Sequence, residues 1–297
     1  MLGLRLGSAG LFKEFHMRAR LIGSSLLLAL TIATRAAAAD PPYYLALGDS
    51  LAIGIQPDAD GNYTPTDQGY VDDLYAFFRA RFPTLQLAKL GCSGETTASM
   101  YSGQDSPCYP AGTSQLSQAL QFLQTHRVVL ITIDIGADDL LGCFALQPVP
   151  AVDQGCIAGA FQAAPANLAG ILSQLQTAAP NALIVGMNYY DPFLAAWLLG
   201  PTGRALASLS LGIVSAFNDG INGLESIYRL HHVPMADVAA TFRSGGTSPR
   251  VTAANVTLAL AWTWMSAPSL RGPDVHPNAF GYLAIASAFA RVIAVTP

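Results

Sequence analysis

Basic residues are scarce in this chain of 297 residues, and scarcer still beyond its first 39. Of the 15 lysines and arginines, five lie in residues 1–39 together with one of the 19 acidic residues, which leaves a formal net charge of −8 for residues 40–297. Lys89 is the only lysine of that part. An acidic surface without a basic stripe suits neither nucleic acid nor an anionic membrane. We therefore expect no nucleic-acid partner.

A hydrophobic run long enough to span a bilayer is also missing, although 52% of the residues are hydrophobic. The apolar stretch at residues 21–33 follows two arginines and precedes the small residues 37–39, which predicts a signal peptide over residues 1–39. Met17, just ahead of the arginines, is an alternative start. An uncleaved anchor is the competing interpretation, but a spanning helix needs about 20 apolar residues. We expect a secreted protein, extracellular or periplasmic, without stable membrane insertion once the leader is removed.

Cysteine spacings typical of metal sites are absent, because the chain contains neither Cys-x-x-Cys nor a Cys/His zinc pattern. All four cysteines, Cys92, Cys108, Cys143 and Cys156, follow the leader, and an even number in an exported protein predicts disulfides. Three pairings are possible. We favour Cys92–Cys108 and Cys143–Cys156, because each pair brackets one loop of turn-forming or small residues; free buried thiols are the alternative. We expect neither a metal nor a cofactor.

Strand-like and helix-like segments alternate from residue 40 onward. Apolar runs of strand character cover residues 43–47, 85–90, 128–135, 182–188 and 233–238. Helical spacing is found over residues 70–82, 114–126, 160–178, 203–230 and 279–294. The alternation predicts βαβ units, and hence a parallel sheet with helices on both faces, in a single domain over residues 40–297. In such a sheet the ligand site lies beyond the carboxyl ends of the strands.

Polar loops with residues suited to catalysis fall at these strand ends. Ser50 follows the first strand, within a Gly-Asp-Ser tripeptide that has ordinary turn chemistry as its alternative explanation. His276 lies in the loop before the last helix, where two prolines stiffen the chain and Asp274 is near enough to orient the imidazole ring. A serine nucleophile needs such a base and such an orienting group.

Four blocks of sequence together resemble the SGNH hydrolases, also called GDSL lipases/esterases. They are residues 48–51 (Gly-Asp-Ser-Leu), 93–96 (Ser-Gly-Glu-Thr), 136–139 (Gly-Ala-Asp-Asp) and 274–277 (Asp-Val-His-Pro). The resemblance implies a three-layer α/β/α, flavodoxin-like fold with a five-stranded parallel sheet, and hydrolysis of carboxylic esters through an acyl-enzyme. It implies Ser50 as nucleophile, His276 as general base and Asp274 as orienting acid, with the backbone N–H groups of Ser50 and Gly94 in the oxyanion hole. No Gly-x-Ser-x-Gly elbow occurs, which disfavours an ordinary α/β-hydrolase.

Two positions depart from the pattern of that family. Its acid commonly stands three residues before the histidine, where this chain has Pro273; Asp274 is two before, and a backbone carbonyl is the alternative partner of His276. The third block commonly contains an asparagine whose amide is the third oxyanion donor. Here that residue is Asp138, and an ionised carboxylate cannot donate a hydrogen bond. We therefore expect weak activity in a narrow, acid-shifted pH window, and a structural role for Asp139.

The sequence as a whole predicts a secreted serine esterase or lipase, a monomer that acts on a small-molecule or lipid ester. A carbohydrate O-deacetylase is the alternative enzyme, and Asp138 also suggests a catalytically feeble SGNH-like binding or cell-surface protein. Ser93 is the alternative nucleophile. Trp262 and Trp264 precede the histidine loop and are candidates for an acyl pocket, with plain core packing as the alternative.

Overall fold

A computed structural model describes residues 40–145, 151–246, 249–266 and 273–296. The predicted signal peptide, its cleavage site and Met17 lie outside the described residues. The chain divides into two units, Met1–Asp40 and Pro41–Pro297, and every element below belongs to the second.

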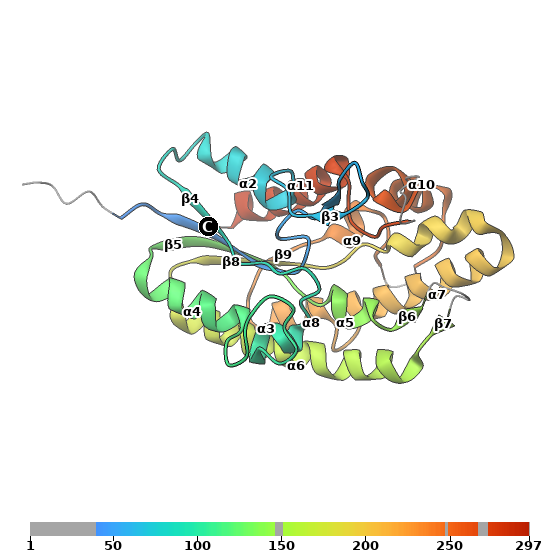
Figure 1. Cartoon of the computed structure of the whole chain (residues 1–297), viewed down its shortest axis with the longest axis horizontal. Coiled ribbons are helices and arrows are strands. Elements are labelled where there is room, and N and C mark those ends of the chain that lie inside the picture. The colour runs from blue at the N-terminus through green and yellow to red at the C-terminus, as the bar shows by residue number, and fades with distance from the viewer. Residues whose placement is uncertain (1–39, 146–150, 247–248, 267–272, 297) are drawn as a thin grey trace, which may run out of the picture. The chain divides into compact units, whose positions relative to one another are not determined.

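A parallel sheet of five strands forms the centre of this unit (Figure 1). The strands are β1 (Tyr43–Gly48), β4 (Gln86–Lys89), β5 (Val128–Asp134), β8 (Leu183–Met187) and β9 (Met235–Ala236), in the spatial order β4-β1-β5-β8-β9. Two short hairpins pair β2 (Gln56–Pro57) with β3 (Tyr63–Thr64), and β6 (Phe144–Ala145) with β7 (Ala151–Val152). The strand order is that of flavodoxin-like folds, which confirms the predicted fold class.

Helices cover both faces of the sheet (Figure 1). One layer consists of α2 (Tyr70–Arg79), α9 (Val238–Thr241), α10 (Ala253–Trp262) and α11 (Ala279–Val295). The other consists of α3 (Thr97–Ser102), α4 (Gln115–Thr125), α6 (Gln154–Ala178) and α8 (Leu224–Leu230). The remaining helices are α5 (Ala137–Leu141), which follows β5, the 3-10 helix η1 (Pro192–Leu199), which follows β8, α7 (Gly200–Asp219), and the short 3-10 helix η2 (Trp264–Ser266). The apolar faces of both layers pack on the sheet, so the core lies on each side of it.

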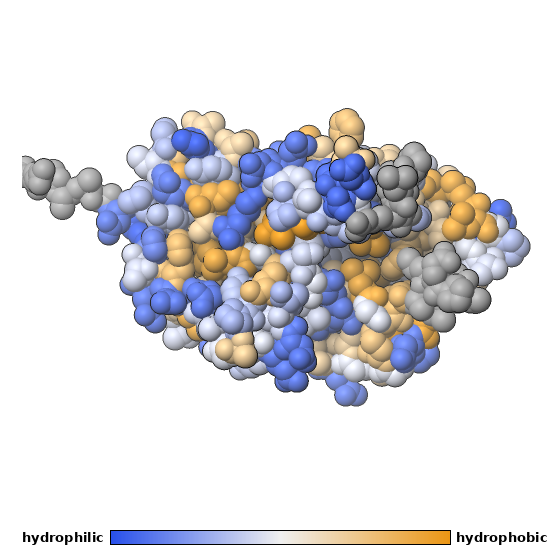
Figure 2. Space-filling view, in the orientation of Figure 1, coloured by the Kyte–Doolittle hydropathy of each residue, from blue (hydrophilic) through white to orange (hydrophobic). Residues whose placement is uncertain are grey.

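Helix α6 is, among the described residues, the one helix with the length and apolar composition to cross a membrane. In this structure it packs against α3, α4 and α8, and Leu168, Ile171 and Leu172 are fully buried in the core. Exposed apolar side chains occur elsewhere. Figure 2 shows hydrophobic surface where η1 runs into α7, and Leu198 and Leu199 there are largely exposed.

Two predicted helices differ from those observed. The helix expected over residues 203–230 is interrupted between α7 and α8, where a Cβ on Gly220 would lie 2.4 Å from a backbone oxygen and the Gly223 N–H donates to the Gly220 carbonyl. The helix expected from residue 160 begins earlier, at Gln154, because the Asp153 carboxylate caps its first turn. Helices α3 and α10 were not predicted.

The strand order reverses between β1 and β5, and in open α/β sheets ligands bind at such a switch point. Ser50 lies in the turn after β1, and Asp138 lies in α5, which follows β5. The topology therefore brings two of the four sequence blocks, residues 48–51 and 136–139, to one edge of the sheet.

Candidate active site

The turn that holds Ser50 is fixed by close contacts at the end of β1. Gly48 has a positive φ of 143°, and a Cβ there would lie 2.2 Å from the backbone oxygen of Asp134, so only glycine fits. Gln115 holds the same residue from the other side, because its side-chain amide accepts from the Gly48 N–H at 2.6 Å and donates to the Gly48 carbonyl at 2.9 Å. The Asp49 carboxyl then accepts the Leu51 N–H at 2.9 Å and closes the turn around Ser50.

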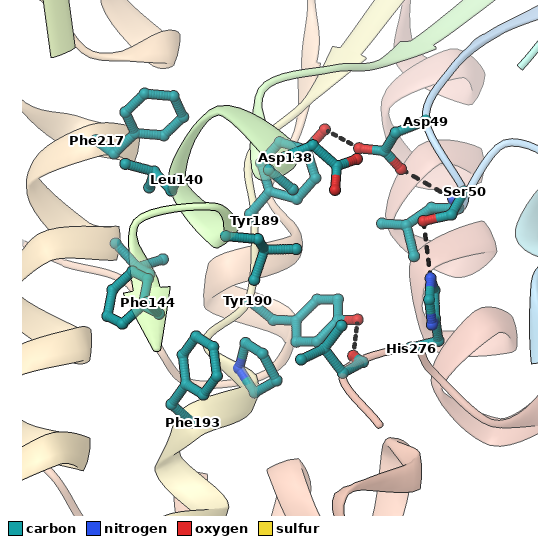
Figure 3. Close-up of a pocket in the computed structure, with 16 residues that line it drawn as sticks. Asp49, Ser50, Asp138, Leu140, Phe144, Tyr189, Tyr190, Phe193, Phe217 and His276 are labelled. Carbon is teal, nitrogen blue, oxygen red and sulfur yellow. Dashed lines mark hydrogen bonds between the residues drawn. The ribbon is translucent and has the colours of Figure 1, made fainter. Parts of the chain in front are cut away.

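Ser50, His276 and Asp274 form one chain of hydrogen bonds, although 223 residues or more separate the serine from the other two. The Ser50 Oγ lies 2.8 Å from the His276 Nε2 (Figure 3). The His276 Nδ1 lies 2.9 Å from the Asp274 Oδ1, which also accepts the His276 backbone N–H at 2.8 Å. This arrangement favours the tautomer with the proton on Nδ1, which leaves Nε2 free to accept the serine proton. Of the two orienting partners considered from the sequence, the structure places the Asp274 carboxylate at Nδ1.

The loop of His276 is anchored through its backbone. Trp264 pairs with it on both sides: its N–H donates to the His276 carbonyl at 3.0 Å, and its carbonyl accepts the Asp274 N–H at 3.3 Å. The Tyr190 hydroxyl donates to the Val275 carbonyl at 2.7 Å. The backbone of the histidine loop is therefore held by η2 and by the segment that follows β8.

The backbone donors expected at an oxyanion hole stand free in the described structure. Neither the Ser50 N–H nor the Gly94 N–H donates to another group of the described residues. Gly94 has a left-handed φ of 81°, and its turn is fixed by the Cys92–Cys108 disulfide and by the Cys92 N–H, which donates to the Gly48 carbonyl at 3.0 Å. Both N–H groups are thus without an acceptor in the described part of the chain.

Asp138 lies at the start of α5, and its carboxyl points toward the Asp49 and Ser50 side of the pocket (Figure 3). Its Oδ2 is buried and has no hydrogen-bond partner among the described residues. Burial, with the nearby Asp49, Asp139 and Glu95 as lesser causes, raises the pKa of Asp138 to about 8, while the positive charge that His276 can carry acts in the opposite direction. At neutral pH the group is therefore mostly a carboxylic acid, which can donate a hydrogen bond.

Asp139 makes contacts of a different kind. Its carboxylate accepts the Thr97 N–H at 2.8 Å and the Thr97 hydroxyl at 2.7 Å, and the same hydroxyl accepts the Asn167 amide at 3.2 Å. These bonds tie α5 to α3 and α6, as the predicted structural role requires.

A buried pair of carboxyls behind Ser50 was missed by the sequence reasoning. Asp49 and Asp134 are almost fully buried and face each other at the ends of β1 and β5; Tyr189 donates to Asp49 at 3.1 Å, and Tyr70 donates to Asp134. Burial is the main cause that raises the pKa of each, and their proximity adds to it for Asp49, so the pair keeps a proton at neutral pH. The available signal was a charged residue at the end of the otherwise apolar strand β5.

An apolar pocket opens beside the hydrogen-bonded chain (Figure 3). Ser50, Asp138 and His276 lie on its border, and most of the rest of its wall is hydrophobic: Leu140, Leu141, Phe144, Phe193, Val214 and Phe217. The two tryptophans proposed for such a pocket do not line it. Trp262 packs edge-on against Phe242, with ring centroids 5.1 Å apart, and Trp264 contributes backbone bonds to the histidine loop.

Disulfides join Cys92 to Cys108 and Cys143 to Cys156. No cluster of three or more metal-ligating side chains was found in the described part of the chain.

The fold and this site define a class of protein: a flavodoxin-like α/β sheet with a Ser-His-Asp arrangement at its switch point. The chain belongs to the GDSL-like Lipase/Acylhydrolase family, which matches residues 46–284, and membership implies ester hydrolysis. Among solved structures, it is similar to an extracellular lipase from Streptomyces rimosus (19% identity, 84% of this chain and 99% of that chain, TM-score 0.50). It is also similar to a GDSL-like lipase from Parabacteroides merdae (14% identity, 86% and 97%, TM-score 0.50). These likenesses concern the fold. The comparison with curated proteins finds no match.

Proposed function

We propose that the protein is a secreted serine esterase that hydrolyses carboxylic esters through an acyl-enzyme on Ser50. The observation that carries the proposal is the 2.8 Å contact from the Ser50 Oγ to the His276 Nε2, continued from Nδ1 to Asp274. Two disulfides and the predicted leader support export, because disulfides persist in oxidising compartments.

The chemistry follows from the geometry. The Ser50 Oγ attacks the ester carbonyl while the His276 Nε2 takes the hydroxyl proton, and the Asp274 carboxylate stabilises the imidazolium. The oxyanion accepts from the Ser50 and Gly94 N–H groups, and from Asp138 while that group is protonated. His276 returns its proton to the alcohol oxygen as the carbon–oxygen bond breaks. Water then attacks the acyl-serine by the same route, and His276 again acts as base and then as acid.

The apolar pocket favours the esterase over the binding protein as the function. A hydrophobic cavity bordered by a serine, a histidine and free backbone donors suits an acyl chain whose carbonyl rests at Ser50. Protonation of Asp138 removes the main objection to catalysis, because the neutral acid supplies the hydrogen bond of the missing amide.

The test is hydrolysis of p-nitrophenyl acetate and butyrate by the leaderless protein. Ser50→Ala should lower kcat by about 10⁴-fold or more, because nucleophile and base act as a unit. Ser93→Ala is the matched control: Ser93 is exposed on a neighbouring turn and was the alternative nucleophile, so this variant should retain activity. Turnover that survives in Ser50→Ala and disappears in Ser93→Ala would reverse the assignment, and no Ser50-dependent turnover would favour the binding protein.

A further inference from the structure

The pocket beside Ser50 is short as well as apolar. Its volume is about 60 Å³, less than half of the roughly 150 Å³ of an apolar cavity that takes up benzene. By this comparison the pocket holds a smaller apolar group than benzene, which has six carbons. Ser50 and His276 lie on one side of this space, and Phe144, Phe193 and Phe217 lie across from them (Figure 3).

Two of these aromatic rings stack on each other in the wall of the pocket. Phe144 and Phe193 stack with ring centroids 4.9 Å apart and an interplanar angle of 27°. Phe193 is almost completely buried, and its N–H donates at 2.9 Å to Asp191, which caps η1. The Ser210 hydroxyl donates to the same carboxyl at 2.8 Å, so α7 fixes the cap in turn. The cap therefore fixes the backbone of Phe193, and burial leaves its ring little room to turn.

Phe144 is held by covalent and backbone contacts on both sides. The preceding residue, Cys143, is bonded to Cys156 in the first turn of α6, and its carbonyl accepts the Asp153 N–H at 2.9 Å. Phe144 itself pairs with Val152 across the β6–β7 hairpin. The disulfide thus ties the strand that carries one wall of the pocket to a core helix.

From these contacts we infer that the Phe144–Phe193 pair sets an upper limit on acyl length near four carbons, and that the Cys143–Cys156 bridge maintains this limit. The inference rests on the proposed function. The acyl group is the occupant rather than the alcohol, because the acyl part stays bonded to Ser50 while the alcohol must leave and be replaced by water beside His276. An apolar pocket with two stacked rings across from Ser50 suits the group that stays.

The experiment is a series of p-nitrophenyl esters from acetate to decanoate, with kcat/KM measured for each. In the unmodified protein kcat/KM should be highest at butyrate and at least about tenfold lower at octanoate, because a pocket discriminates about tenfold or more against a methylene that it cannot hold. Phe144→Ala should move the optimum to hexanoate or longer, with a gain of about fourfold for each methylene newly buried. Phe144→Leu, a smaller change, should shift the optimum in the same direction. It replaces the alanine variant in the experiment if that variant does not fold.

Phe122→Ala is the matched control. Phe122 also belongs to a stacked ring pair, with His126 at 3.9 Å, but it packs near Tyr43 at the opposite end of β1 from Ser50. Its chain-length profile should match that of the unmodified protein.

The bridge is tested with a pair of double variants. Cys143→Ser/Cys156→Ser should raise the octanoate-to-butyrate ratio of kcat/KM, because Phe144 gains freedom to move. Cys92→Ser/Cys108→Ser should leave that ratio unchanged, whatever it does to the absolute rate.

Three results would overturn the inference. They are an optimum at octanoate in the unmodified protein, a uniform loss over all chain lengths in both Phe144 variants, and a length limit that follows the alcohol in a series of alkyl acetates instead of the acyl chain. Each of these still shows Ser50-dependent hydrolysis and so leaves the proposed function standing. Absence of Ser50-dependent hydrolysis of every ester would refute both.

Discussion

Replacing Asp138 with asparagine tests the most unusual residue of the site. At pH 7 the two forms should have similar turnover, because the pKa of Asp138 lies at about 8 and most molecules hold a proton there that can be donated to the oxyanion. Above pH 8 the carboxyl ionises, loses its donor and repels the developing charge. Loss of one oxyanion donor costs about 100- to 1000-fold in kcat, so the ionised form contributes almost nothing.

The size of the effect follows from the pKa. One pH unit above a pKa of about 8, about one molecule in eleven remains protonated, so kcat/KM at pH 9 should be about tenfold below its plateau. Asparagine does not titrate, so the ratio of kcat/KM for Asp138→Asn to that of the unmodified protein should rise from about 1 at pH 7 to about 10 at pH 9. The window predicted from the sequence therefore has its alkaline edge near pH 8.

The assay is a pH–rate profile from pH 5 to 9.5 on p-nitrophenyl butyrate, with Ser50→Ala as the background at each pH. Asp139→Asn makes the same chemical change one residue along, at a carboxyl bound to Thr97, and should keep the alkaline fall in activity. The argument is refuted if the activity of Asp138→Asn relative to the unmodified protein does not change with pH. That result would place the Asp138 carboxyl outside the oxyanion hole.

Two further predictions concern stability. Burial without a cation raises the pKa of Asp191 to about 7, so the folded protein binds its proton more tightly than the unfolded chain and stability falls as pH rises from about 4 to 7. The difference in free energy of unfolding between the unmodified protein and Asp191→Asn should fall by about 1.4 kcal/mol per pH unit in that range and level off above it. Denaturant titrations of both proteins at several pH values measure this difference. The same dependence of unfolding free energy on pH in both proteins would contradict the prediction. Non-reducing peptide mapping should find Cys92 bonded to Cys108, and the corresponding double serine variant should lose about 3 kcal/mol, whereas a Cys92–Cys143 peptide would exclude this pairing.

The sheet could be predicted from the sequence because its central strands are recognisable as short apolar runs. β5 is β-branched and buried on both faces, so its residues form a nearly continuous apolar run. The break between α7 and α8 was harder to see, because Gly220 acts through a close approach to Ala216 that helical spacing does not reveal. Periodicity reports which face of an element is apolar, and it does not report where a backbone contact ends the element.

The candidate site was likewise predicted in part. Ser50, Asp274 and His276 were found because each lies in a short block with its own chemistry. The pocket was not found, because Phe144 and Phe193 come from separate segments whose approach depends on a disulfide and a helix cap. Trp262 and Trp264 were chosen as pocket candidates because they precede the histidine loop in the sequence, and this proximity did not predict the wall of the pocket.

The shortage of basic residues noted in the sequence has a consequence at the site itself. Among the described residues, His276 is the only basic side chain that borders the pocket, and the sole lysine of residues 40–297 is paired with Asp72 at 2.7 Å. A lysine or arginine beside Asp138 would stabilise its ionised form and lower its pKa, and so remove the proton that an oxyanion donor needs. Burial among other carboxyls does the opposite. No lysine or arginine of the residues that the structure describes borders the pocket, which supports the proposal that a protonated Asp138 donates the hydrogen bond of an asparagine amide.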